Sequence, residues 1–129
     1  MIPDIEKITI QYLKGEGINA VGATPKDTGL EWVKVQQVGT RQVSAIDQDY
    51  FNAHHLQLDC YASADGPEFT GEVNTLYRNV RADLVLMPDA TLSCVVTAVR
   101  FSSGIRLPDT DFNPHRQRYV LDAFIYAHA

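Results

Sequence analysis

The sequence predicts an α+β fold, a two-layer sandwich in which two helices cover a mainly antiparallel sheet of four to five strands. The chain has 129 residues, close to the commonest size of one domain. Two segments repeat apolar residues at helical spacing, and several others alternate apolar with polar residues as strands do. No internal repeat, low-complexity stretch or linker divides the chain, so residues 1–129 are expected to form a single domain.

The first expected helix is residues 3–14. Ile5, Ile8 and Tyr12 recur there at helical spacing. Pro3 suits the first turn of a helix, because a backbone N–H is not needed there. Gly15 follows the last residue and ends the helix.

The second expected helix is residues 67–86. Ser63 or Asp65 can cap its start, and Pro88 prevents it from continuing. Its apolar residues recur every three or four positions and form one stripe, which is expected to face the core: Phe69, Val73, Leu76, Val80 and Leu84.

Strands are expected at residues 32–38, 55–61, 91–101 and 118–128, with a short one around Ala20. Two long connections separate them, residues 39–53 and residues 102–117. Hairpin loops usually have about two to five residues, so the first connection is unusual. Either its flanking strands extend into a projecting hairpin arm, or it is a contact loop, or it is a plain mobile loop.

The net charge of −5 argues against a sequence-independent nucleic-acid binder, whose affinity comes from Lys and Arg on phosphates. The first residues lack a basic segment followed by an apolar core, so no signal peptide is expected. No apolar run approaches the roughly 20 residues that span a bilayer. We therefore expect a soluble protein that is intracellular when made and has no membrane contact.

Two segments look at first like metal sites. His54 and His55 are adjacent, so in a strand they point to opposite faces and cannot bind one metal ion together. Asp109 opens a stretch that resembles a calcium loop, but Pro114 and Val120 stand where that loop needs Gly and Glu. We expect no metal and no other cofactor.

No catalytic motif is recognisable in the chain. Cys60 and Cys94 lie in alternating apolar runs, where buried free thiols are the expected state. Either could be a nucleophile only with a histidine beside it in the fold. Glu68 and Glu72 form a helical pair that is more typical of a solvated surface than of acid–base catalysis. The chain is therefore expected to be a binding or assembly protein, not an enzyme.

Both faces of the last two strands are substantially apolar. Two helices can cover only one face of a small sheet, and an antiparallel sheet with a wet face should alternate apolar and polar residues. The second face must therefore be covered by the chain's own loops or by another chain, and self-association is the favoured of the two. The expected interface residues are Val96, Ala98, Phe124 and Tyr126.

Taken in order, several segments resemble the tail terminator (tail completion) proteins of long-tailed bacteriophages. The opening from Pro3 to Leu13, the turn at Pro25, and the strand from Trp32 that closes on Val38 and Gly39 follow the family's order. The stretch 56–62, running into the long helix, and the ending from Pro108 through Pro114 to Val120 are also similar. The likeness covers almost the whole chain, although the connection 39–53 is longer than is usual in the family.

The resemblance implies a structural virion protein of the tail and neck, assembled in the host cytoplasm. Such a protein forms a ring, usually a hexamer, that caps the tail tube, ends tube polymerisation and joins the tail to the head connector or head-closure protein. DNA passes through the ring without specific binding. The residues expected to dock on the tail or the connector are the charged residues of the two long connections: Arg41, Asp47, Asp49, Arg106 and Arg116.

Three other functions remain open, one of them a tail-tube subunit, which would be expected to give open-ended polymers. Another neck protein, such as a head–tail connector or head-closure protein, would also be small, ring-forming and free of catalysis. A small ligand-binding α+β domain would instead have a deep pocket with convergent polar groups and shifted pKa values.

Overall fold

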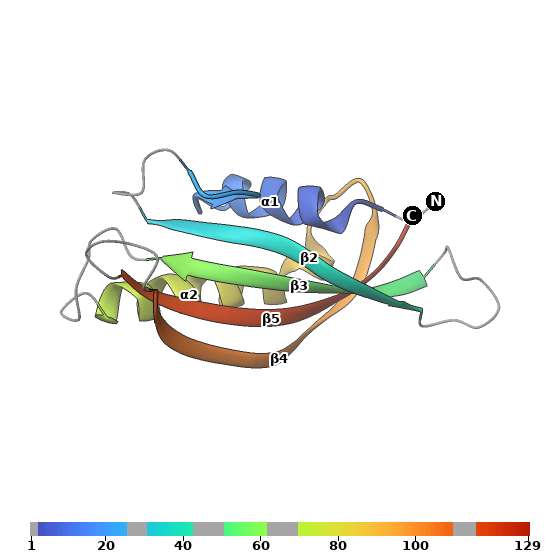
Figure 1. Ribbon diagram of the computed structural model, residues 1–129. Helices are drawn as coiled ribbons and strands as arrows, with labels where there is room; N and C mark the ends of the chain where they lie inside the picture. The colour runs from blue at the N-terminus through green and yellow to red at the C-terminus, as the bar shows by residue number, and fades with distance from the viewer. Residues whose placement is uncertain (1–2, 26–30, 43–50, 62–69, 110–115) are drawn as a thin grey trace.

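The structure, a computed structural model, describes residues 3–25, 31–42, 51–61, 70–109 and 116–129. The predicted α+β class is confirmed, with two α-helices and a mostly antiparallel sheet of five strands in the order β1-β2-β3-β5-β4. Only β1 and β2 run parallel. Both helices lie on the same side of the sheet (Figure 1). The elements in chain order are α1 (Ile5–Gly15), β1 (Ala20–Val21), β2 (Trp32–Gln42), β3 (Phe51–Tyr61), α2 (Thr70–Val85), the 3-10 helix η2 (Met87–Asp89), β4 (Val95–Asp109) and β5 (Arg116–His128).

Helix α1 begins two residues later than predicted, at Ile5, because Asp4 caps it. The Asp4 carboxylate accepts a hydrogen bond from the backbone N–H of Lys7 at 3.2 Å, which satisfies one free donor of the first turn. Ile5 and Leu13 are fully buried on the sheet side. Gly17 then turns the chain with a φ of 86°, a conformation that favours glycine.

Helix α2 confirms the expected apolar stripe. Val73, Leu76, Val80 and Leu84 are buried against the sheet. The helix ends at Val85 and passes into η2, where Pro88 stands within the first two positions. The expected caps Ser63 and Asp65, the predicted first turn with Phe69, and Glu68 lie outside the described residues.

Both long connections are shorter in the structure than the sequence predicts, because the strands continue into them. Strands β2 and β3 pair from Trp32 with Tyr61 to Gln42 with Asn52, so the extended hairpin is the correct alternative for these residues. Strands β4 and β5 likewise pair as far as Asp109 with Arg116, so the loop predicted at residues 102–117 was wrong over most of its length. The remaining residues, 43–50 and 110–115, lie outside the described part.

Gly104 and Pro108 suggested a loop in the sequence, but both lie within β4, the edge strand of the sheet. Pro108 has no N–H to donate, which an edge strand tolerates. A Cβ atom on Gly104 would lie 2.6 Å from the Tyr77 hydroxyl and 3.2 Å from the Tyr119 ring, so only glycine fits there without displacement. The two rings stack at 3.8 Å between centroids, over the point where α2 crosses the sheet.

The edge of β2 beyond the short β1 is partly covered by α1. The Glu6 side chain reaches from the helix and accepts a hydrogen bond from the backbone N–H of Gln37 at 3.0 Å. One donor of this strand is thus satisfied without a neighbouring strand.

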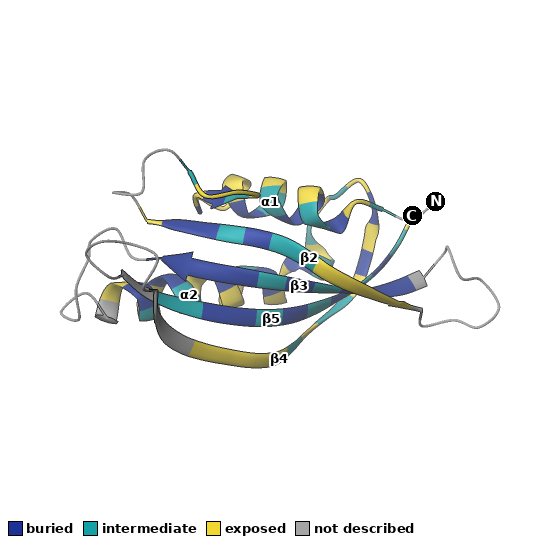
Figure 2. Cartoon of the chain, in the orientation of Figure 1, coloured by how far each residue is buried: buried dark blue, intermediate teal, exposed yellow. Residues whose placement is uncertain are grey.

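The core fills the space between the helices and one face of the sheet, here called the core face. Strands β3 and β5 lie in the middle of the sheet and are the most buried, whereas β4 is largely exposed (Figure 2). The fully buried core residues of β2, β3 and β5 are Val33, Val35, Leu56, Leu58, Cys60, Leu121, Ala123, Ile125 and Ala127.

Strand β4 does not keep strict alternation, which corrects one sequence prediction. The register shifts between Val96 and Ala98 and again between Phe101 and Ser103, as at β-bulges. Val96 pairs with Ala127 and is only 5 % exposed, so it belongs to the core. Val96 therefore does not share a face with Ala98, contrary to the expected interface set.

Candidate interaction surfaces

The second face of the sheet, here called the outer face, points away from the helices. The polarity and exposure of its side chains change from one end to the other. Cross-strand pairing arranges its side chains in rows. The row of Trp32 and Tyr61 lies at one end, and the row of Tyr126 lies towards the other end. Polar rows stand between these ends, so the apolar residues expected on the second face are not continuous along it.

The Trp32 end of the outer face is closed. The Trp32 and Tyr61 rings stack at 4.0 Å with an angle of 13° between their planes. The Arg118 guanidinium lies 3.7 Å from the Asp59 carboxylate. Trp32 is 1 % exposed and Tyr61 is 4 % exposed, so these two rings offer little apolar surface, whereas Ile105 of β4 in the next row is 53 % exposed.

A serine, an aspartate and a histidine meet in the middle of the outer face. The Ser103 hydroxyl donates to Asp122 Oδ2 at 2.8 Å, and His55 Nε2 lies 3.0 Å from Asp122 Oδ1. A nucleophilic serine needs the imidazole itself to take its proton. Here the carboxylate stands between the two groups, so the arrangement orients side chains and does not form a catalytic triad.

The Tyr126 end of the outer face is open. Tyr126 pairs with Ala53 on one side and Ala98 on the other, and these small side chains leave the aromatic ring partly exposed. The Arg41 guanidinium lies 3.5 Å from the Tyr126 hydroxyl, and the Arg100 guanidinium lies 5.8 Å from the ring centroid. Both arginines are exposed.

Phe124 extends this open surface by one row. Its ring stacks on His55 at 4.5 Å and remains partly exposed. Val95, at the same end of β4, is 48 % exposed. We call Arg41, Ala98, Arg100, Phe124 and Tyr126 together the aromatic–arginine patch. Three of the four residues predicted for the interface lie in it, and the fourth, Val96, lies in the core.

Among the described residues, the predicted docking residues Arg41, Arg106 and Arg116 lie at different ends of the sheet. Arg41 lies in β2 beside Tyr126, in the aromatic–arginine patch. Asp47 and Asp49 lie outside the described residues. Arg106 and Arg116 belong to the paired backbone of β4 and β5, but their side chains are not among the described ones. Along β5, Arg116 is ten residues from Tyr126, roughly 30 Å in an extended strand.

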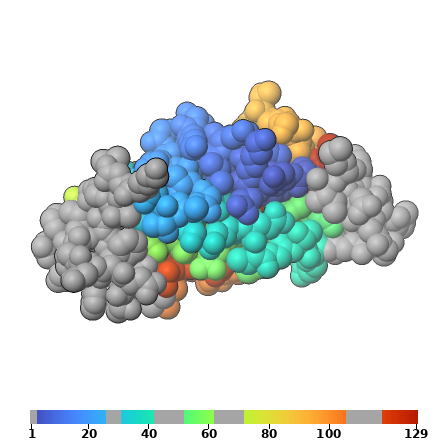
Figure 3. All heavy atoms as spheres, turned by 45° about the horizontal axis from the view of Figure 1, so that its top comes forward, coloured from blue at the N-terminus to red at the C-terminus, as the bar shows by residue number. Residues whose placement is uncertain are grey.

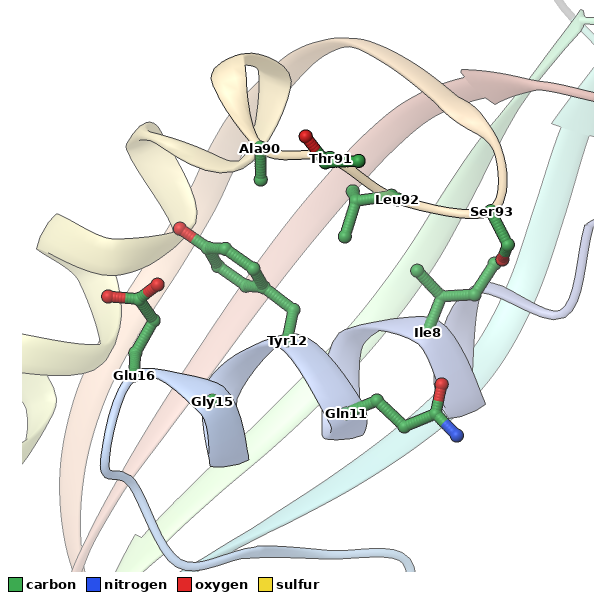
Figure 4. Close-up of a pocket in the computed structure, with 9 residues that line it drawn as sticks. All are labelled: Ile8, Gln11, Tyr12, Gly15, Glu16, Ala90, Thr91, Leu92 and Ser93. Atoms are coloured by element: carbon green, nitrogen blue, oxygen red, sulfur yellow. The ribbon is translucent and has the colours of Figure 1, made fainter.

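A groove on the helix side was not predicted from the sequence. It lies between α1 with its C-cap residue Glu16 and residues 90–93 that follow η2, and the helix contributes Ile8, Gln11 and Tyr12 (Figure 4). Its volume is about 490 Å³. Figure 3 shows α1 flanked by the segment after α2 on one side and by β2 on the other. We call this the α1 groove.

One end of the α1 groove is acidic. The Tyr12 hydroxyl donates to the backbone carbonyl of Asp83 near the end of α2. Burial raises the pKa of Tyr12, and the nearby carboxylates of Glu16 and Asp83 raise it further. Burial also raises the pKa of Asp83. Asp89, in η2, is exposed.

The opposite end of the α1 groove adjoins a second pocket of about 470 Å³, which shares Ile8, Gln11 and Ser93 with it. This second pocket reaches Pro3 and Ala129, so the described ends of the chain lie close together. The sequence pattern assigned Tyr12 to an apolar helix face, and it gave no sign that a segment after the second helix would lie beside it.

His54 is buried on the core face, whereas its neighbour in sequence, His55, lies on the outer face. Gln37 Nε2 lies 3.0 Å from His54 Nδ1 and 2.8 Å from Thr40 Oγ1. An amide nitrogen donates, so His54 Nδ1 accepts, and the proton of the neutral ring sits on Nε2. Among the described residues, His54 Nε2 is buried without a hydrogen-bond partner. Burial lowers the pKa of His54.

The expected free and buried thiols are confirmed for both cysteines. Burial raises the pKa of Cys60, with smaller contributions from Asp59 and Glu31, and burial also raises the pKa of Cys94. A raised pKa makes a thiol a poor nucleophile. Within the described part of the chain, no group of three or more His, Cys, Asp or Glu residues is placed to hold a metal ion.

No helix in the described ranges is long and apolar enough to cross a membrane. No protein-family model matches the sequence, and no curated protein matches it either.

Proposed function

We propose that the chain is a structural virion protein that forms a ring on the tail tube, ends tube polymerisation and joins the tail to the head connector. The sequence resemblance to tail terminator proteins suggests this function. The physical observation that carries it is the aromatic–arginine patch. The proposal includes no catalytic step and no cofactor.

The patch supports self-assembly because of its composition and exposure. Phe124 and Tyr126 are partly exposed on the sheet face opposite α1 and α2, and Val95 beside them is 48 % exposed. Aromatic residues together with arginine are typical of the buried centres of protein interfaces. A surface of this kind is stabilised when another protein surface removes it from water.

The helix layer supports an assembly role in a second way. The clefts beside α1 are open, and the strongly shifted pKa belongs to the buried Cys60 thiol. Tyr12 and Asp83 at the end of the α1 groove also have raised pKa values, but the Tyr12 hydroxyl is engaged with the Asp83 backbone carbonyl. A ligand-binding enzyme would bring several polar groups with shifted pKa values into one pocket. The α1 groove is therefore better suited to a protein partner than to a small substrate.

The decisive experiment mixes the purified protein with the tail-tube protein of the same virus and images the products by electron microscopy. We expect short tubes, each closed at one end by a ring. Tubes of undiminished length without a cap would overturn the proposal. A connector or head-closure protein would leave the tubes unchanged and bind filled heads, so a parallel binding assay with DNA-filled heads separates the two functions.

A further inference from the structure

The aromatic–arginine patch differs in charge from the rest of the molecule. Arg41 and Arg100 give the patch two positive charges, whereas the chain has a net charge of −5, which leaves −7 on the remainder. Two copies that met patch to patch would place four guanidinium groups against one another. Like charges at a contact cost several kcal/mol, so this symmetric arrangement is disfavoured. The patch is better matched by a different, acidic surface of a second copy.

The α1 groove provides such a surface. Glu16 lies at its acidic end, with Asp83 close to Tyr12 and the exposed Asp89 in the adjoining turn. Its walls are partly apolar, with Ile8, Tyr12 and Leu92 facing the hollow (Figure 4).

The groove also has room for side chains of the patch. Its volume of about 490 Å³ lies within the usual range of binding pockets, about 300–1,000 Å³. Neither Lys7 nor Lys14 of α1 lines the groove; both line a separate pocket with Asp4 and Glu6. The groove can therefore receive an aromatic ring together with an arginine.

The two surfaces lie on opposite layers of the protein. The patch is on the outer face of the sheet, and the groove is beside α1 on the helix side (Figure 1). One molecule can therefore use both surfaces at the same time. A contact between two different surfaces repeats from copy to copy and produces a ring when the rotation closes.

We propose that the aromatic–arginine patch of one copy docks into the α1 groove of the next copy. Tyr126 and Phe124 enter the groove, and Arg41 and Arg100 lie against Glu16 and its acidic neighbours. This inference rests on the ring of the proposed function and identifies the two surfaces that join its subunits.

Charge reversal tests the pairing. The patch variant is Arg100→Glu and the groove variant is Glu16→Lys, both at exposed positions. Each variant alone is expected to need a protein concentration at least about tenfold higher for half-assembly, because like charges then meet at every junction. The measurement is analytical ultracentrifugation combined with electron microscopy of rings, alone and on tail tubes.

Mixing the two variants gives the sharpest result. The reversed patch of Arg100→Glu faces the reversed groove of Glu16→Lys, and the remaining two surfaces are wild type. An equimolar mixture is therefore expected to regain rings of alternating composition, which native mass spectrometry can identify. The double variant Arg100→Glu/Glu16→Lys is expected to form rings by itself for the same reason.

The controls reverse equal charges elsewhere. Arg78→Glu on α2 and Glu31→Lys before β2 are exposed and lie outside both surfaces. They are expected to assemble like the wild type. Thermal unfolding followed by circular dichroism checks that every variant is folded, so that loss of rings is not caused by loss of structure.

Three outcomes would overturn the inference. If the wild type forms rings and Glu16→Lys does so equally well, the groove is not the acceptor, although the ring proposal stands. If Arg100→Glu regains assembly equally well with the wild type and with Glu16→Lys, the patches meet each other. If the patch instead binds a single-stranded oligonucleotide, and Arg100→Glu abolishes that binding without changing the rings, its partner is nucleic acid. Failure of the wild type to form rings, alone or on tubes, would instead refute the proposed function.

Discussion

His54 and His55 are neighbours in β3, yet they lie in two different environments. His54 is buried on the core face, and its Nδ1 accepts a hydrogen bond from Gln37. His55 lies on the outer face, stacked on Phe124 and bonded to Asp122. The comparison teaches that the two faces of this sheet serve different purposes. The core face stabilises the fold, whereas the outer face presents groups that a partner can reach.

The largest expected effect is on the free energy of unfolding, and it distinguishes the core face from the outer face within β5. Leu121→Ala removes a fully buried side chain and leaves a cavity, which should lower the free energy of unfolding by about 3 kcal/mol. Phe124→Ala removes a partly exposed ring and its stacking on His55, which should cost about 1 kcal/mol in the monomer. Urea unfolding at low protein concentration measures both. Equal losses would mean that the outer face is packed as tightly as the core.

A second, smaller effect is expected at the edge strand. Gly104→Ala places a methyl group against the Tyr77 and Tyr119 rings, which must shift, at a cost of about 1–2 kcal/mol. The neighbouring variant Ser102→Ala, at an exposed bulge position, should be close to neutral. Thermal unfolding and the near-ultraviolet circular dichroism of the tyrosines report the difference. An unperturbed tyrosine signal in Gly104→Ala would contradict the tight contact.

The third prediction concerns the pH dependence of stability. Burial lowers the pKa of His54 from its ordinary value of 6.5, so the unfolded chain binds this proton more readily than the folded chain. The contribution of His54 to stability is fully present above pH 6.5 and is lost as the pH falls from there through the lowered pKa. Within that window the slope cannot exceed about 1.4 kcal/mol per pH unit for one proton.

Two variants test whether His54 causes this pH dependence of the free energy of unfolding. His54→Phe should remove the slope that His54 contributes, whereas His55→Gln should keep it, because the buried ring is unchanged. Urea unfolding between pH 5 and pH 8, a range of about three units around the ordinary histidine pKa, is the measurement. If the His54→Phe variant retains the full slope of the wild type, the buried histidine is not its source.

The smallest effect is expected in the middle of the outer face. Asp122→Asn removes the charge that faces His55 and Ser103 but keeps an oxygen that can accept from the serine. Partly exposed pairs of this kind contribute about 0–1 kcal/mol, so the free energy of unfolding should change by less than about 1 kcal/mol. A loss several times larger would show that this polar row is essential to the fold.

The α+β class and both helices could be predicted from the sequence, because their patterns are local. The stripe from Val73 to Leu84 repeats at helical spacing, and β3 and β5 alternate in strict order. The strand ends could not be predicted, because Gly104 and Pro108 are typical of loops. Gly104 is needed here because Tyr77 packs against it, and an edge strand tolerates the missing N–H of Pro108.

The candidate surfaces were predictable only in part. The outer-face positions of Ala98, Phe124 and Tyr126 could be predicted from strand alternation. The position of Val96 could not, because the bulge between Val96 and Ala98 puts these two residues on opposite faces of the sheet. The α1 groove depends on where Leu92 lies relative to Tyr12, and these residues are eighty positions apart in the sequence. The periodicity of apolar residues carries no information about contacts between residues so far apart in the sequence.

The carboxylate of Glu6 has a consequence for how copies of the protein can meet. By occupying the N–H of Gln37 it blocks one position at which a strand from another molecule could begin to pair. Unregulated growth by sheet extension is thus discouraged along β2, and association is directed to side-chain surfaces that can be matched in shape and charge. A protein that is proposed to end the growth of a polymer must not itself polymerise through its sheet edges.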